Sequence, residues 1–199
     1  MVVYVLPKWT DRNLCKGIVV DTTSSTSTKY RELSPFILGP ISTYLPDLFS
    51  KNFENLWQYS KVYPTQVDER GQPTITWLQW RLNGWNNPRA VRYPMGKGAK
   101  PLYSYWDGLK MGYIEARKKI YAKKYSENVV KTKSFRNLFS LYEEACSKGS
   151  DITLLDYDAY DYINKGMSLK DVINYPSLKM GHAFVLAMTL TGVLDKCLE

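Results

Sequence analysis

YWDGLKMGYIEARKKIYAKKY, residues 105–125, carries the pattern that decides the fold class predicted from this sequence. Apolar side chains recur there at spacings of three and four residues, as on one face of an α-helix. These side chains are Trp106, Leu109, Tyr113, Ala116 and Ile120. Lysines and arginines fill the remaining face, which is either a solvated surface or a surface for an anionic partner. The stretch therefore predicts an amphipathic helix.

Further helices are predicted on both sides of this stretch, and strands only in short segments. The predicted helices cover residues 52–63, 76–82, 132–147, 168–174 and 178–192, the last of them buried. The candidate strands are VVYVL at 2–6, GIVV at 17–20 and a short strand or turn within DITLLDYDAYDYI at 151–163. No internal repeat or interdomain linker is visible. The sequence therefore predicts a mainly α fold, α+β with minor short strands, in a single domain over residues 1–199.

The composition suits a globular protein with an anionic partner. Apolar residues make up 44% of the chain, which is ordinary for a protein with a buried core. The net charge is +8 with one histidine, a balance that fits a nucleotide or nucleic acid but also serves solubility. Six Trp and sixteen Tyr exceed what core packing needs, so some of them are available to stack on a base or line a sugar pocket.

The cysteines and the single histidine argue against a metal site. Cys15, Cys146 and Cys197 show no CxxC spacing, so we expect no zinc, no other metal and no cofactor. Reduced and mostly buried thiols are the simplest interpretation. The apolar run at the N-terminus is too short for a signal peptide, and no segment approaches membrane-spanning length. A soluble, cytoplasmic protein without a membrane partner is predicted.

The most unusual side chains for chemistry lie in NFENLWQYSK, residues 52–61. As a helix, this segment places Glu54, Gln58 and Lys61 on one stripe together with Trp57. Partial burial among aromatic neighbours could raise the pKa of Glu54 toward that of a working acid or base. The alternative is a buried Glu–Lys ion pair with a structural role. The only histidine, His182, fits a helix start or a core position better than a catalytic one.

Several separated segments together match one known pattern. They are LSPF at 33–36, ENLWQYSK at 54–61, MGKGAKPLYSYWDGLK at 95–110, DAYDY at 158–162 and MGHAFVLAM at 180–188. In these segments, and in their order, the sequence resembles the NADAR family, the YbiA-like N-glycosidases. The resemblance covers a core of about residues 33–192. It implies a single compact, YbiA-like helical domain that needs no metal and hydrolyses an N-glycosidic bond.

The resemblance also implies the residues of the site. Glu54, Trp106 and Asp158 are carried over as catalytic, with the two acids stabilising positive charge on the anomeric carbon or protonating the leaving nitrogen. Lys61 joins them, either orienting Glu54 or holding a phosphate, or attacking an opened ribose as an amine. The expected substrate-binding residues are Ser34, Phe36, Trp57, Gln58, Arg92, Lys97, Lys100 and Tyr160.

The substrate implied is an ADP-ribosyl or ribosyl nucleotide, such as ADP-ribose on guanine in a nucleotide or in single-stranded nucleic acid. A related enzyme reading is degradation of a soluble ADP-ribose-derived signal. Asn55 stands where the family pattern has His, and Asp161 and Tyr162 stand where it has Trp-Gly. These positions favour a rival interpretation, a non-catalytic pocket that sequesters a nucleotide. A third interpretation is a nucleic-acid-binding accessory protein.

Overall fold

The computed structural model describes residues 1–26 and 29–199, which divide into two compact units. Unit 1 comprises Met1–Ser34 and Ala122–Glu199, and unit 2 comprises Pro35–Tyr121. The single-domain organisation stays a prediction.

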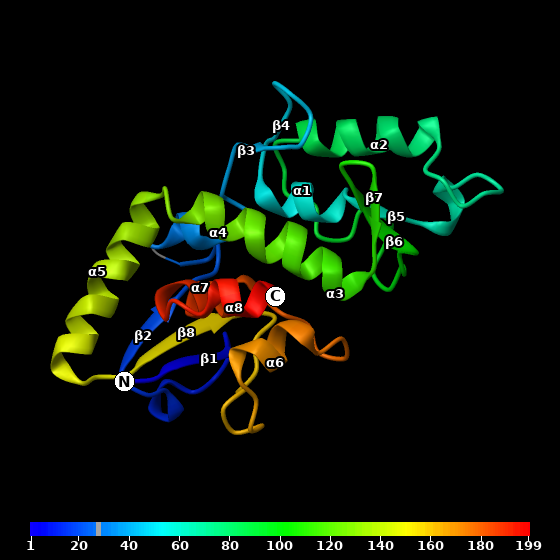
Figure 1. Cartoon of the computed structure of the whole chain (residues 1–199). Helices are drawn as coiled ribbons and strands as arrows, with labels where there is room; N and C mark the ends of the chain where they lie inside the picture. Colours follow the sequence, from blue (N-terminus) through cyan, green and yellow to red (C-terminus); the bar gives the residue numbers. More distant parts are fainter. Residues whose placement is uncertain (27–28) are drawn as a thin grey trace. The chain divides into compact units, whose positions relative to one another are not determined.

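Unit 1 is built on a three-stranded parallel sheet with strand order β1-β8-β2 (Figure 1). Its strands are β1 (Val3–Pro7), β2 (Ile18–Asp21) and β8 (Ile152–Asp156). The central strand, β8, is buried at all five positions, which its continuous run ITLLD allows because both faces of the strand are covered. Because all three strands are parallel, their carboxyl ends lie at the same end of the sheet.

Helices complete unit 1. They are η1 (Arg12–Leu14), η2 (Arg31–Leu33), α4 (Lys123–Val129), α5 (Lys133–Lys148), α6 (Leu169–Asn174), α7 (His182–Leu190) and α8 (Leu194–Leu198). α7 packs against β1 and β8 and is buried at every position except Thr189. The predicted helices at 132–147 and 168–174 are confirmed, with Thr132 and Ser168 as the side-chain N-caps.

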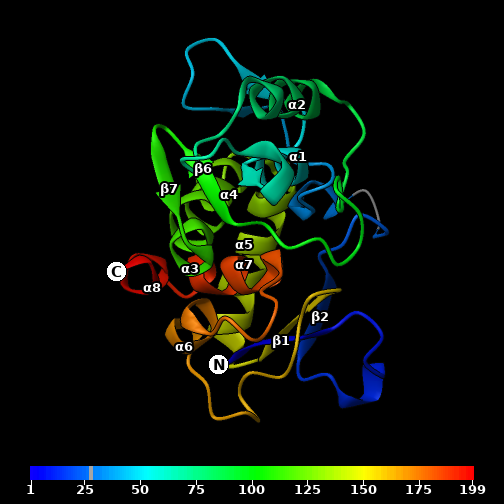
Figure 2. The same cartoon turned by 90° about the vertical axis from the view of Figure 1, so that its right-hand side faces the viewer.

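Unit 2 contains short strands and helices (Figure 2). They are β3 (Ile41–Ser42), β4 (Phe49–Ser50), α1 (Phe53–Gln58), β5 (Lys61–Val62), η3 (Pro64–Gln66), α2 (Ile75–Asn86), β6 (Tyr103–Trp106), β7 (Leu109–Met111) and α3 (Tyr113–Ala116). The strands form a β3-β4 pair and a three-stranded sheet of order β5-β6-β7. A π-helix, η4 (Arg117–Ala122), contains the boundary between the units.

The prediction of a mainly α fold is wrong. Helix accounts for 41% of the chain and strand for 15%, and three small sheets make this a mixed α/β fold. The strands were underestimated for two reasons. Several have only two to four residues, too few for a period to show, and β8 is apolar throughout rather than alternating.

The prediction of a helix over 105–125 is also wrong for its first third, because these residues belong to a β-hairpin. β6 and β7 pair antiparallel with Trp106 opposite Leu109. The two residues between them, Asp107 and Gly108, have φ of 48° and 78°. Positive φ at both positions is what a type I′ hairpin turn requires, and Asp-Gly favours it. Helix begins only at Tyr113.

Candidate functional site

The clearest functional candidate in unit 2 is the polar series on α1. Gln58 Nε2 donates a hydrogen bond to Glu54 Oε1 at 2.9 Å, one helical turn away. Lys61 Nζ donates to Gln58 Oε1 at 2.6 Å. The same ammonium lies 4.8 Å from the ring centroid of Trp57. We call Glu54, Gln58, Lys61 and Trp57 the α1 cluster.

Local structure fixes the α1 cluster. Asn52 caps the helix by accepting a hydrogen bond from the backbone N–H of Asn55 at 2.9 Å. The helix ends at Gln58, so the predicted helix over 52–63 is too long, and Lys61 lies in β5 instead. The turn between α1 and β5 still leaves the Lys61 amine within hydrogen-bonding distance of Gln58 on the helix.

Burial gives the α1 cluster its chemical character. Glu54 and Gln58 are 6% and 8% exposed, and Lys61 is half-buried. A buried carboxylate needs hydrogen bonds or a positive charge nearby, and Gln58 supplies the first while linking Glu54 to the Lys61 ammonium. The amide holds Glu54 in one orientation. This geometry favours the interpretation in which Lys61 orients Glu54.

Asn55 holds the loop that follows α2. Its Nδ2 donates to the carbonyls of Asn87 and Arg89, both at 2.9 Å, and its Oδ1 accepts from the N–H of Val91 at 2.8 Å. The side chain is fully buried. Because both ends of the amide are bonded to backbone, Asn55 has a structural role at the position where the NADAR pattern has His.

Trp106 lies in an aromatic cluster rather than on an open face. It is 8% exposed, with the ring centroids of Tyr44 and Trp85 at 4.9 and 6.0 Å. Arg81, 3% exposed, donates to the Tyr44 hydroxyl and lies over the rings of Tyr44, Trp77 and Trp85. Cation–π contacts stabilise this buried guanidinium. The catalytic role of Trp106 stays a prediction.

The other predicted substrate-binding residues of unit 2 lie nearer the surface. Phe36 is 36% exposed, and Lys97 and Lys100 are exposed in the loop after α2. The Arg92 guanidinium lies 5.5 Å from the ring centroid of Tyr93. Among the predicted site residues of unit 2, the structure shows contacts joining the four members of the α1 cluster to one another.

Three predicted residues belong to unit 1. Ser34 is buried at the end of η2. Asp158 is half-buried, and the Lys179 ammonium lies 4.0 Å from its Oδ1. The Tyr160 ring packs on Phe184, with centroids 4.8 Å apart. All three stay predictions as substrate or catalytic residues.

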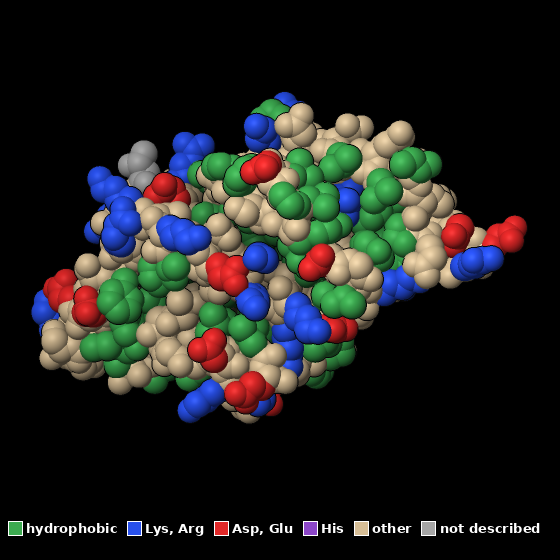
Figure 3. Space-filling model, turned by 45° about the horizontal axis from the view of Figure 1, so that its top comes forward, with side chains coloured by type: hydrophobic (Ala, Val, Ile, Leu, Met, Phe, Trp, Pro, Cys, Tyr) green, Lys and Arg blue, Asp and Glu red, His purple; other side chains and the backbone are tan. Residues whose placement is uncertain are grey.

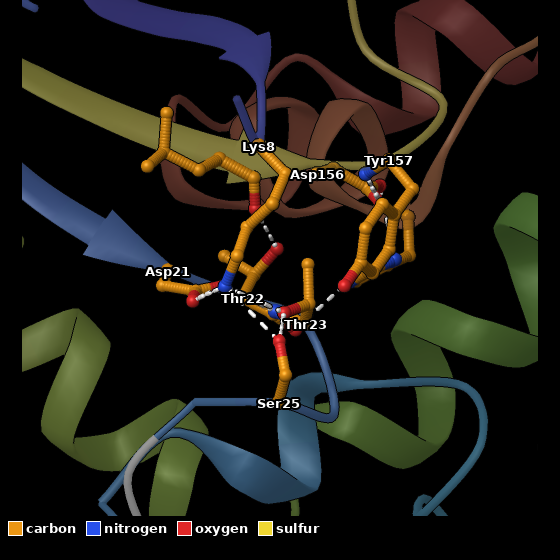
Figure 4. Close-up of polar contacts among 9 residues, drawn as sticks. Lys8, Asp21, Thr22, Thr23, Ser25, Asp156 and Tyr157 are labelled. Carbon is orange, nitrogen blue, oxygen red and sulfur yellow. Dashed lines mark hydrogen bonds and ion pairs between the residues drawn. The ribbon is translucent and has the colours of Figure 1, made fainter. Parts of the chain in front are cut away.

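Unit 1 offers a second candidate, at the carboxyl ends of its parallel strands, where ligands bind in many α/β proteins (Figure 4). Lys8, directly after β1, pairs with Asp21 at the end of β2. Its Nζ also lies 3.2 Å from the Thr23 hydroxyl and 3.0 Å from that of Ser25. Asp21 Oδ1 accepts from the Thr23 N–H and hydroxyl at 3.0 and 2.8 Å. No motif in the sequence marks this cluster, whose members come from separate segments of the chain.

The Lys8 cluster ties Thr23 and Ser25 to the end of β2. An ammonium has three protons to donate, and Asp21, Thr23 and Ser25 accept all three. The Lys8 amine is therefore fully engaged by these three oxygen acceptors, and the cluster has a structural role at the end of β2.

Asp156 and His182 join the end of β8 to the start of α7. His182 Nδ1 lies 3.0 Å from Asp156 Oδ2, and Nε2 lies 2.9 Å from the carbonyl oxygen of Thr22. Both neighbours only accept hydrogen bonds, so the ring carries a proton on each nitrogen and is an imidazolium. The Asp156 carboxylate also accepts the N–H groups of Tyr157 and Ala183 at 2.6 and 3.1 Å. The expectation of a helix-start histidine is confirmed.

The pKa of Asp156 follows from these contacts. Burial by itself raises the pKa, but the charge and hydrogen bond of His182, with two backbone N–H groups, outweigh it and lower the pKa below 3.8. The result is a buried ion pair that fixes α7 on the sheet. Glycine precedes His182 because a Cβ at Gly181 would lie 2.1 Å from Asp156 Oδ2.

The remaining site predictions concern metals, thiols and membranes. Among the described residues, no three His, Cys, Asp or Glu side chains gather in a way that could hold a metal ion. Cys146 is exposed, Cys15 is half-buried and Cys197 is buried, so the expectation of mostly buried thiols is wrong. In the part of the chain that the structure describes, no helix has the length and apolarity needed to cross a membrane.

Comparison with known proteins identifies one family. A search of curated proteins and a search of solved structures found no match. The model of a family of unknown function, DUF6939, matches residues 7–170. This match spans most of the chain and parts of both units. The chain therefore belongs to the DUF6939 family.

Proposed function

We propose that the protein is a hydrolase of N-glycosidic bonds, acting on an ADP-ribosyl or ribosyl nucleotide in the cytoplasm, with Glu54 as its acid–base residue. The observation that carries the proposal is the hydrogen-bonded series Lys61–Gln58–Glu54. It holds a buried carboxylate in one orientation, with the Lys61 ammonium over the Trp57 ring. The resemblance to N-glycosidases in the same segment supports the proposal independently of the geometry.

The proposed reaction breaks the bond between the anomeric carbon and the base nitrogen. Positive charge develops on the sugar, and the Glu54 carboxylate stabilises it. A water oxygen bonds to the anomeric carbon while its proton passes to Glu54. The electron pair of the broken bond stays on the base nitrogen, which takes a proton from a second acid. The Asp158→Asn variant separately tests the sequence-based prediction that Asp158 is catalytic.

A nucleotide-binding pocket without turnover is the second candidate. Asn55 favours it, because its amide is fully engaged with backbone and leaves no group at this position for chemistry. In this case the α1 cluster binds the substrate, and the ribosyl–base bond stays intact.

The test measures release of ADP-ribose from ADP-ribosylated guanine, supplied as nucleoside and in single-stranded DNA, by mass spectrometry. The proposal expects release by the wild type and loss of at least about 100-fold in Glu54→Gln, a typical effect of removing a general acid or base. Asp158→Asn is measured in parallel. Binding without release supports the pocket interpretation. If the protein neither binds nor cleaves any of these substrates, both the hydrolase proposal and the pocket interpretation are contradicted.

Lys61 is tested by reduction with borohydride during turnover. We expect no covalent adduct, since the Lys61 amine donates to Gln58 and acts by orienting Glu54. Lys61→Met should lower the rate less than Glu54→Gln does. An adduct that disappears in Lys61→Met would instead identify Lys61 as the nucleophile.

A further inference from the structure

Five basic side chains gather on one surface of unit 1. η2 packs against α5, and Figure 3 shows Lys and Arg side chains at the upper left of the view, where these elements lie. All five side chains are exposed. We call this set the basic surface: Lys29, Arg31, Lys131, Lys133 and Arg136.

Hydrogen bonds hold the segments of the basic surface together. The Glu32 carboxylate accepts from the N–H and hydroxyl of Ser134 at 3.1 and 3.2 Å. Asn137 Nδ2 donates to the Lys29 carbonyl at 3.4 Å, and Arg136 Nη1 donates to the Lys131 carbonyl at 3.0 Å. These contacts bring two segments about one hundred residues apart into one fixed arrangement.

The charges of the basic surface are not neutralised. Within residues 1–26 and 29–199, none of its five cations forms an ion pair with a carboxylate. Glu32, the acid among them, accepts hydrogen bonds from Ser134 and offsets one charge, so the surface keeps an excess of cations. Glu144, on which Lys29 has a weak influence, is paired with Lys148. Five unpaired cations on one surface repel one another, so an anionic partner gains from binding there.

Aromatic rings lie among these cations. The Phe139 side chain is 40% exposed, three residues after Arg136 and so on the same side of α5. Its ring is supported by stacking on Phe135, at a centroid distance of 6.2 Å. Tyr30 is half-buried, with the Lys29 ammonium 5.3 Å from its ring. Cations interleaved with supported rings are typical of surfaces that bind single-stranded nucleic acid.

We propose that the basic surface binds single-stranded nucleic acid through its phosphates, with Phe139 as a stacking platform. The inference goes beyond the proposed function and does not depend on turnover. It names nucleic acid, rather than a free nucleotide, as a partner of the chain. The contacts it invokes are sequence-independent, because they address the phosphate backbone and the faces of the bases.

The test is fluorescence anisotropy with a mixed-sequence single-stranded DNA of about 16 nucleotides, a length within the usual range of single-strand sites. Binding is measured over a series of salt concentrations with the full chain carrying Glu54→Gln, so that no turnover can interfere. Five neutralised phosphates predict a slope of log K against log salt of about −3.5. The variant Lys29→Gln/Arg31→Gln/Lys133→Gln should reduce this slope to about −1.4.

A matched variant controls for net charge. Lys16→Gln/Lys165→Gln/Lys196→Gln removes the same three charges from exposed lysines elsewhere in unit 1. It should keep the slope near that of the parent. Phe139→Leu should weaken binding to single strands by roughly tenfold while leaving the slope unchanged, because stacking contributes about 1–3 kcal/mol per base.

Four results would overturn the inference. They are no DNA binding by the parent protein, equal losses in the two triple variants, no loss in either, and binding only to vesicles that contain phosphatidylserine. The Arg31→Gln single variant provides the same comparison with one exposed side chain changed, should the triple variant be poorly folded. It should lower the magnitude of the slope by about 0.7.

Discussion

The carboxylate of Asp156 and the imidazolium of His182 form a buried ion pair, with Oδ2 and Nδ1 3.0 Å apart and both side chains 6% exposed. The pair joins the last residue of the central strand to the first residue of α7. The only histidine of the chain is thus explained by the fold of unit 1.

Removing either partner of this pair should destabilise the protein strongly. We expect His182→Gln and Asp156→Asn each to lower the free energy of unfolding by roughly 3–5 kcal/mol, because the remaining group is left buried without its partner. Urea unfolding measures the loss. Asp195→Asn, an exposed acid of α8, is the control and should change stability by less than about 0.5 kcal/mol. A loss of unfolding free energy in Asp195→Asn as large as in the His182 and Asp156 variants would contradict a stabilising role specific to the ion pair.

The ion pair also predicts an acid-dependent loss of stability. The pKa of Asp156 is lowered in the folded state, since His182 and the N–H groups outweigh burial. Its contribution is therefore fully present above the unfolded pKa, near 3.9, and is lost as pH falls through the lower folded pKa. Unfolding free energies measured from pH 5 to pH 2 should fall more steeply for the wild type than for Asp156→Asn. Parallel curves would contradict the assignment.

Tyr162 predicts a loss of stability at alkaline pH. Burial, followed by the nearby Asp161 and Tyr4, raises its pKa to about 12, and its hydroxyl donates to the Val3 carbonyl at 2.9 Å. Since the folded pKa is raised, the contribution is fully present below pH 10 and is lost as pH rises toward 12. Tyr162→Phe should flatten the alkaline decline measured by denaturant unfolding. An unchanged decline would show that other groups cause it.

The close approach of α1 and α2 makes Gly84 sensitive to substitution. A Cβ there would lie 2.0–2.2 Å from ring atoms of Tyr59, whose ring packs on Trp80. Gly84→Ala should therefore destabilise the protein by about 1–3 kcal/mol in thermal or urea unfolding. Gly112→Ala is the matched control, because a Cβ at that position meets nothing within 4 Å. Equal effects of the two substitutions would contradict the packing argument.

Asn55 should protect the loop after α2 from proteolysis. Asn55→Ala leaves two carbonyls and the Val91 N–H without their side-chain partner. We expect trypsin to cleave faster after Arg89 in native buffer, as followed by mass spectrometry. Cleavage at an unchanged rate would mean that the loop is held by other contacts.

Local sequence signals predicted many of the helices and strands correctly. The helices predicted at 132–147 and 168–174 are α5 and α6, and the apolar runs at 2–6 and 17–20 contain β1 and β2. The parallel pairing of β1 and β2 with β8 could not be predicted, because it joins segments about 130 to 150 residues apart. A strand buried on both faces carries no period that would identify its partners.

The hairpin of β6 and β7 was missed although its signal is present. Asp107-Gly108 is a strong type I′ signal, but the spacing of Trp106, Leu109 and Tyr113 also fits a helix. Helical spacing predicted all four residues of the α1 cluster on one helix, and the structure confirms this for Glu54, Trp57 and Gln58 but places Lys61 in β5. The return of Lys61 from β5 depends on the turn after the helix, which spacing alone does not specify.

The most direct test of the central claim is the single-turnover rate of ADP-ribose release from ADP-ribosylated guanine by wild-type protein and Glu54→Gln, with the fold of both checked by circular dichroism. Gln58→Glu is measured alongside, since it keeps the size of the side chain but removes the amide that donates to Glu54. The proposal predicts release by the wild type, a rate lower by about 10²–10⁴ in Glu54→Gln, and an intermediate rate in Gln58→Glu. Equal rates in the wild type and a well-folded Glu54→Gln would contradict the role of Glu54.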